Sequence, residues 1–89
     1  MAQIFLMIIV RQREKMTEQD LGLILNKMYN ETKKGEKVTI IHLFGIKYGN
    51  LIRENNCSFK NIVKNANISE TYVTELTKGA NLAKYVKER

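Results

Sequence analysis

The sequence contains no proline and only five glycines in 89 residues, so few positions interrupt a regular backbone. Proline breaks the interior of a helix, and glycine costs about 1 kcal/mol there relative to alanine. Long segments rich in Leu, Ile, Met and Lys repeat their apolar residues at helical spacing. These features favour an all-α fold, a compact bundle of about five short helices, with a core small enough that a homodimer would bury useful apolar surface.

Cysteine and histidine are almost absent, since Cys57 and His42 are the only residues of their types. No disulfide can form within the chain, and the reducing cytoplasm is the expected compartment. Cys57 is predicted to be a half-exposed loop thiol, and His42, in an apolar context, a packed or surface side chain and not a metal ligand. No zinc spacing, phosphate-binding glycine loop or Ser/His/Asp set is present. We therefore expect no catalysis, no cofactor and no metal.

Long apolar runs are also missing. The run MAQIFLMIIV at residues 1–10 is too short to span a bilayer, and basic residues follow it instead of preceding it as in a secretory signal. Its composition allows either a strand or an extra helix over residues 1–12. We treat residues 1–15 as an apolar and basic extension and residues 16–89 as the helical domain; whether the extension belongs to the working protein is left open. Thr17 and Asp20 resemble a capping box at the start of that domain.

Two longer helices are predicted before residue 58. Residues 17–32 carry one apolar stripe, and the break at residues 33–36 contains Gly35. Residues 37–55 carry a second stripe, although a short strand at residues 39–41 is also compatible with the sequence. Gly45 and Gly49 within this segment indicate either close helix packing or a kink. A last short helix is predicted at residues 80–88, with Leu82, Tyr85 and Val86 closing the core.

Residues 58–79 are predicted to form two short amphipathic helices joined by a tight polar turn. The first has apolar residues at i, i+3, i+4 and i+7, namely Phe59, Ile62, Val63 and Ala66. Ser58 is placed to cap its start, and Asn67 follows its last apolar residue, where a left-handed backbone is wanted. In the second helix we expect Ser69 to cap the start, Val73 and Leu76 to face inward, Glu75 to face outward and Gly79 to end the helix.

This segment resembles the helix-turn-helix of Cro-type and lambda-repressor-type bacterial and phage regulators. The matching features are a small residue at Ala66, a branched one at Ile68, Ser69 at the start of the second helix, Val73 and Leu76 inside it, and Lys78-Gly79 at its end. Asn67 replaces the usual turn glycine, and Glu70 and Glu75 stand where such regulators often carry Arg, Gln or Lys. From Lys34 onward the chain also looks like small bacterial and phage proteins with a helix-turn-helix-like domain. The resemblance implies binding of double-stranded DNA.

The formal net charge is +6, and the positive excess lies mainly in residues 33–89. A basic surface attracts polyanions, although lysines can also simply make a helical surface soluble. Lys60, Lys64 and Lys78 are the candidate phosphate contacts. The residues placed to reach bases or backbone are Ser69, Glu70, Thr71, Tyr72 and Thr74, and Tyr72 is equally placed to flank the core. Glutamate can accept a hydrogen bond from the cytosine amino group in the major groove.

The function that the sequence favours is sequence-specific DNA binding by a cytoplasmic transcriptional regulator of bacterial or phage type. The alternative is a protein-protein interaction adaptor, a prophage or defence-system accessory with a degenerate helix-turn-helix that uses its acidic residues and apolar N-terminus against a protein partner. The sequence specifies neither the DNA target, nor the direction of regulation, nor the oligomeric state.

Overall fold

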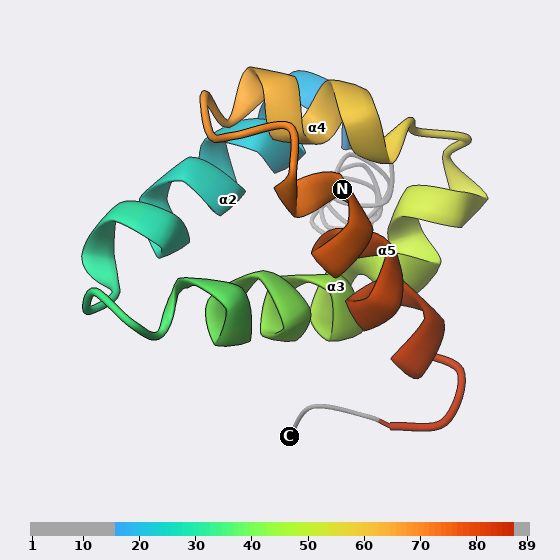
Figure 1. Ribbon diagram of the computed structural model, residues 1–89. Coiled ribbons are helices and arrows are strands. Elements are labelled where there is room, and N and C mark those ends of the chain that lie inside the picture. Colours follow the sequence, from blue (N-terminus) through green and yellow to red (C-terminus); the bar gives the residue numbers. More distant parts are fainter. Residues whose placement is uncertain (1–15, 87–89) are drawn as a thin grey trace, which may run out of the picture.

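The computed structural model describes residues 16–86, in which four helices form two packed pairs. The helices are α2 (Glu18–Glu31), α3 (Lys37–Glu54), α4 (Phe59–Asn65) and α5 (Tyr72–Leu82). Helix α4 packs mainly on α2, and α5 packs mainly on α3, which it crosses in Figure 1. The predicted all-α class is confirmed for this part of the chain. The predictions for residues 1–12 lie outside the described residues, and the division between residues 15 and 16 stays a prediction.

Helix α2 begins at the predicted capping box. The Thr17 hydroxyl accepts a hydrogen bond from the Asp20 amide at 3.1 Å, and the Asp20 carboxylate accepts one from the Thr17 amide at the same distance. Two of the amides that lack partners in the first helical turn are thereby satisfied. Beyond α2 the chain reverses through Gly35, whose φ of +97° is a conformation that glycine adopts without steric cost. The predicted break between the first two helices is therefore confirmed.

Helix α3 is continuous, so the short strand considered at residues 39–41 is not formed. The Lys37 ammonium at its start donates hydrogen bonds to the carbonyls of Tyr29 and Thr32 at the end of α2. Asn56, with φ of +55°, follows the last turn of α3 and redirects the chain toward α4. Asparagine tolerates this left-handed conformation better than other non-glycine residues, so the chain can change direction sharply at the end of α3.

The core lies between the two helix pairs and is entirely apolar. Phe44 and Ile52 of α3, Leu21 of α2 and Leu76 of α5 are fully buried, as is Ile62 of α4. The remaining members of this cluster are Leu25, Ile41, Val63 and Ala66. Every described helix therefore contributes to one core, as the apolar stripes predicted.

The prediction of about five helices is wrong for the described residues, where the last two predicted helices are one. Helix α5 continues through Gly79 to Leu82, and no separate helix begins at Ala80. Gly79 does not end the helix because its missing side chain is used for contact with α3. The prediction that Leu82, Tyr85 and Val86 close the core is also wrong, since they are 44%, 84% and 46% exposed. The core is already filled by residues that precede them.

Candidate nucleic-acid interface

Helix α4 is held at both ends by side chains of α2. The Glu18 carboxylate accepts hydrogen bonds from the Ser58 amide at 2.5 Å and from the Asn61 side-chain amide at 3.1 Å. At the other end the Asn26 side-chain amide donates to the Ala66 carbonyl at 2.8 Å. Ser58 also caps α4 as predicted, accepting from the Asn61 amide at 3.3 Å. A helix of seven residues is unstable by itself in water, so these contacts fix its position.

The turn between α4 and α5 starts at Asn67, whose φ of +58° confirms the predicted left-handed residue. The Ser69 hydroxyl then accepts a hydrogen bond from the Thr71 amide at 3.3 Å, and its carbonyl accepts one from the Tyr72 amide at 3.0 Å. Helix α5 begins at Tyr72, and Thr71, which precedes it, makes no side-chain cap bond. The prediction that Ser69 caps this helix is therefore wrong. Ser69 instead organises the turn, which extends two residues further than the spacing suggested.

Helix α5 lies very close to α3 because small residues face each other at the crossing. A methyl group added to Gly79 would lie 2.5 Å from the His42 carbonyl oxygen, and one added to Gly45 would lie 2.7 Å from the Ala80 nitrogen. Gly49 also meets Ala80, with 2.8 Å from an added methyl to its Cα. The two glycines of α3 thus mark close helix packing, one of the two predicted alternatives. Backbone contact of this kind leaves α5 little freedom to tilt.

The face of α5 opposite this crossing is exposed and polar. It consists of Thr71 in the preceding turn, Thr74 and Lys78 in the helix, and at its edge Asn81, whose side-chain oxygen accepts a hydrogen bond from Arg53 of α3; we call these four residues the outer face. Thr71, Thr74 and Lys78 were predicted for the site; Asn81 was not, because Gly79 was expected to end the helix. The structure therefore brings the three predicted residues onto one surface that could be offered to a groove.

Tyr72 points away from the outer face and lies at the edge of the core. Its ring meets that of Tyr29 edge-on at 5.5 Å between centroids, and the two hydroxyl oxygens are 3.4 Å apart. The hydrogen bond between these hydroxyls, with burial, raises the pKa of Tyr29 above its ordinary value. Of the two roles considered for Tyr72, its position is that of a residue flanking the core.

The charged candidates are distributed around the outer face, and two lysines are near carboxylates. The Lys60 ammonium lies 3.5 Å from Glu70, and the Lys78 ammonium lies 3.4 Å from Glu75. Lys64 is exposed and forms no ion pair with another described residue. Exposed pairs of this kind contribute at most about 1 kcal/mol, so either lysine can exchange its carboxylate for a phosphate.

Glu75 is not an outward residue, contrary to the expectation from helical spacing. Its side chain is only 24% exposed, and one carboxylate oxygen lies 2.7 Å from His42 Nε2 on α3. The hydrogen bond with His42, and to a lesser extent Lys78, lowers the pKa of Glu75 despite the opposing effect of burial. Spacing along α5 could not reveal a partner 33 residues earlier in the chain. His42 is thereby placed beside the outer face, which the sequence did not suggest.

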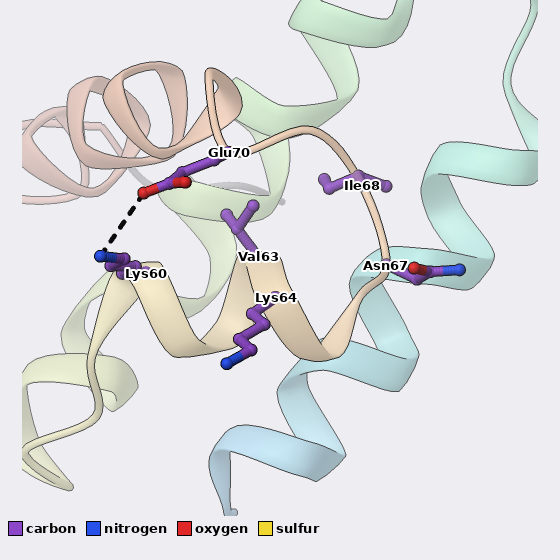
Figure 2. A pocket seen from close by; sticks show the side chains of 6 residues that line it. All are labelled: Lys60, Val63, Lys64, Asn67, Ile68 and Glu70. Atoms are coloured by element: carbon purple, nitrogen blue, oxygen red, sulfur yellow. Dashed lines mark ion pairs between the residues drawn. The ribbon is translucent and has the colours of Figure 1, made fainter.

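A cavity of about 320 Å³ adjoins α4 and the turn, and Figure 2 shows its lining. Val63 of α4 and Ile68 of the turn are its apolar lining, while the Lys60–Glu70 pair closes one side. Lys64 and Asn67 complete the lining. The cavity brings Lys60, Lys64 and Glu70, three of the predicted site residues, to one side of the turn that leads into α5. The approach to the outer face from α4 is thus positively charged.

Comparison with known proteins assigns the chain to a family. The family model described as an HTH-like domain matches residues 17–89. The protein belongs to this helix-turn-helix-like family. A search of curated proteins and a search of solved structures found no match. None of the helices within residues 16–86 combines the length and the apolar character that crossing a bilayer requires.

Proposed function

We propose that this protein is a sequence-specific DNA-binding transcriptional regulator of bacterial or phage type that places α5 in the major groove. The observation that carries the proposal is the outer face: an exposed polar surface on a helix whose other side is fixed against α3 by backbone contact. A recognition helix must present short polar side chains on a rigid support, because base contacts are lost when the helix tilts. Membership of the helix-turn-helix-like family supports the same use of α4 and α5.

Each candidate residue has a role in this proposal. Thr71 and Thr74 contact base edges or the sugar-phosphate backbone, and Glu70 accepts from the cytosine amino group once Lys60 has turned to a phosphate. Lys60 and Lys64 bind phosphates on the α4 side, and Lys78 binds one beside the helix itself. Ser69 holds the turn that aims α5. We propose that the protein works in the cytoplasm, where such a regulator meets DNA. Regulators of the Cro and lambda-repressor type are its proposed functional analogues.

A protein-binding adaptor is the second candidate function, and one observation favours it. The end of α5 and the segment after it expose Leu82, Tyr85 and Val86, and Tyr85 is 84% exposed. Apolar side chains grouped on a surface often mark a contact with protein. The same group would serve a homodimer of the regulator, in which two copies of α5 read half-sites about one helical turn of DNA apart.

The test measures binding to duplex DNA at several salt concentrations. The variant K60A/K64A/K78A is compared with K27A/K33A/K34A, which removes the same charge from α2 and from the turn between α2 and α3. Each phosphate contact contributes about 0.9 to the slope of log affinity against log salt, so the first variant should lose up to roughly 3 units of slope. The control variant should keep its slope. Equal slopes in the two variants would refute the lysine assignment.

Sequence preference is tested separately, because phosphate contacts alone give binding to any duplex. Selection of bound fragments from a random duplex pool should enrich a short motif with the natural protein, and T71A/T74A should lose or change that motif while still binding. No enrichment combined with ordinary salt-dependent binding would contradict the recognition role. No duplex binding at any salt concentration would favour the adaptor.

A further inference from the structure

Three charged or titratable side chains form a chain that leads from α3 to the outer face of α5. His42 Nε2 lies 2.7 Å from Glu75 Oε1, and Glu75 Oε2 lies 3.4 Å from the Lys78 ammonium. Each oxygen of the carboxylate therefore serves a different partner. His42 and Glu75 are 33% and 24% exposed, whereas Lys78 is 61% exposed and belongs to the outer face. A change of charge at His42 can thus affect Lys78, which faces DNA in the proposed complex.

The geometry of this chain is set by the helix crossing and not by the side chains alone. The backbone of His42 is in direct contact with Gly79, since an added methyl at Gly79 would lie 2.5 Å from the His42 carbonyl oxygen and 2.9 Å from its Cα. Glu75 is one turn before Gly79 on α5. The close backbone contact between α3 and α5 therefore holds the imidazole and the carboxylate near each other.

The charge of the carboxylate is unfavourable for binding DNA, because a negative group near the outer face repels phosphate and holds the Lys78 ammonium. A neutral imidazole that donates one hydrogen bond leaves the full negative charge in place. An imidazolium cancels it, which weakens the attraction between Glu75 and Lys78. Histidine is the side chain that changes its charge between pH 5 and 8.

We infer that His42 is a positioning residue for DNA binding, which through Glu75 controls how freely Lys78 reaches a phosphate and makes affinity for duplex DNA increase on acidification. This inference rests on the proposed DNA-binding function. His42 touches no DNA in this arrangement. Its protonation adds one positive charge beside the outer face and releases a second one, that of Lys78, from its carboxylate.

The surroundings of His42 contain few other charges. Glu75 and Lys78 are the ionisable groups that face it from α5. Its neighbours one turn away on α3 are Val38, Thr39, Gly45 and Ile46, none of which is ionisable. No hydrogen bond or ion pair joins His42 to a described residue of α2, the other helix that packs on α3. His42 is also the only histidine in the sequence.

The experiment measures affinity for one duplex at pH 5.5 and pH 8 at constant ionic strength, for the natural protein, H42Q and E75Q. Glutamine at position 42 keeps an N–H donor for Glu75 but cannot take up a proton, and every other titrating group is unchanged. The natural protein should bind roughly threefold to tenfold more tightly at pH 5.5, the effect of about one additional phosphate contact. H42Q should match it at pH 8 and gain little at pH 5.5. E75Q should bind more tightly than the natural protein at pH 8 and keep only the part of the pH response that comes from the charge of His42 itself.

The outcomes separate this inference from the proposed function. Binding with the same pH response in H42Q and the natural protein would overturn the role of His42 and leave DNA binding intact. A full pH response in E75Q would overturn the route through Glu75. Absence of duplex binding at both pH values would refute the proposed function and the inference with it. Circular dichroism at both pH values checks that each variant is folded, and E75Q keeps the test decisive if H42Q does not fold.

Discussion

The pair α3–α5 and the pair α2–α4 both contain glycine, but they are held together differently. At the α3–α5 crossing three glycines, Gly45, Gly49 and Gly79, come from both helices, and backbone meets backbone. In the α2–α4 pair only α2 contributes a glycine, Gly22, and a methyl added there would lie 2.4 Å from Asn65 Cβ and 2.9 Å from the Asn65 backbone carbonyl carbon. There the ends of α4 are held by the side chains of Glu18 and Asn26. The first pair thus has three missing side chains at its contact, whereas the second has one, together with two side chains that hold the ends of α4.

This difference corresponds to the proposed roles of the two outer helices. Helix α5, which we propose to enter the groove, has its position fixed by contacts that cannot lengthen, because the atoms in contact belong to the backbone. Helix α4 carries Lys60 and Lys64 at its surface, and its ends are held by hydrogen bonds that water can replace, although Gly22 of α2 also approaches it closely. A base-reading helix needs a fixed orientation, whereas phosphate-binding lysines tolerate small shifts of their helix.

The strongest way to break the α3–α5 crossing is Gly79→Ala. The added methyl would meet the His42 backbone at 2.5 Å, so the helices must separate. Overpacking of this kind costs typically 1 to 3 kcal/mol, and we expect a net loss in the free energy of unfolding of roughly 3 kcal/mol because backbone cannot yield as a side chain can. Urea unfolding followed by circular dichroism measures the loss.

Gly35→Ala is the matched control for this substitution. No atom lies within 4 Å of a methyl added there, and only the φ of +97° opposes it. We expect a cost of about 1 kcal/mol from the left-handed backbone. Equal losses in the two variants would mean that the close approach of α3 and α5 is not what orders this part of the molecule.

The α2–α4 pair is tested by Glu18→Gln, which keeps the shape of the side chain and removes its charge. The two hydrogen bonds that the carboxylate accepts, from Ser58 and Asn61, become bonds to a neutral oxygen or are lost. Hydrogen bonds to charged groups contribute about 1.5 to 3 kcal/mol and neutral ones about 1 kcal/mol, so we expect a loss of roughly 1 to 2 kcal/mol in the free energy of unfolding.

Glu31→Gln serves as the control for Glu18→Gln, since Glu31 is exposed at the other end of α2 and forms no ion pair with another described residue. Amide hydrogen exchange in α4 should be faster in Glu18→Gln than in the natural protein. In Glu31→Gln the exchange rates of α4 should not change. If both variants unfold at the same urea concentration, the hydrogen bonds of Glu18 do not help to hold α4.

Local signals in the sequence were sufficient for the parts of the fold that depend on nearest neighbours. Thr17 with Asp20, Ser58 and Asn67 each perform the backbone role that their side-chain chemistry predicts. The apolar stripes gave the buried faces, and Gly45 with Gly49 indicated close packing as one alternative. The caps and the turn succeed because the interacting atoms lie within a few residues of each other.

Two of the failures involve partners distant in sequence. Gly79 was expected to end a helix, yet contact with His42 gives it a buried place inside one, and tertiary packing outweighs its low helix propensity. Glu75 was placed outward by spacing alone, but His42 draws it toward α3. Of the candidate site, the positions of Thr71, Thr74 and Lys78 were therefore predictable, whereas the charge on their flank was not.

The smallest effect concerns the polar contact across the α3–α5 crossing and appears only in acid. The pKa of Glu75 is lowered in the folded protein, first by its hydrogen bond with His42, so the folded state binds this proton more weakly than the unfolded chain does. The stabilisation by the carboxylate is complete above its ordinary pKa and is lost as the pH falls through the lowered value. Between pH 7 and pH 3 the natural protein should therefore lose more stability than Glu75→Gln, and by less than the effect of Glu18→Gln, because water screens a partly exposed pair. Urea midpoints at each pH, with Glu31→Gln in parallel, measure the difference. Identical acid profiles for all three proteins would mean that backbone contact alone joins α3 to α5 at His42.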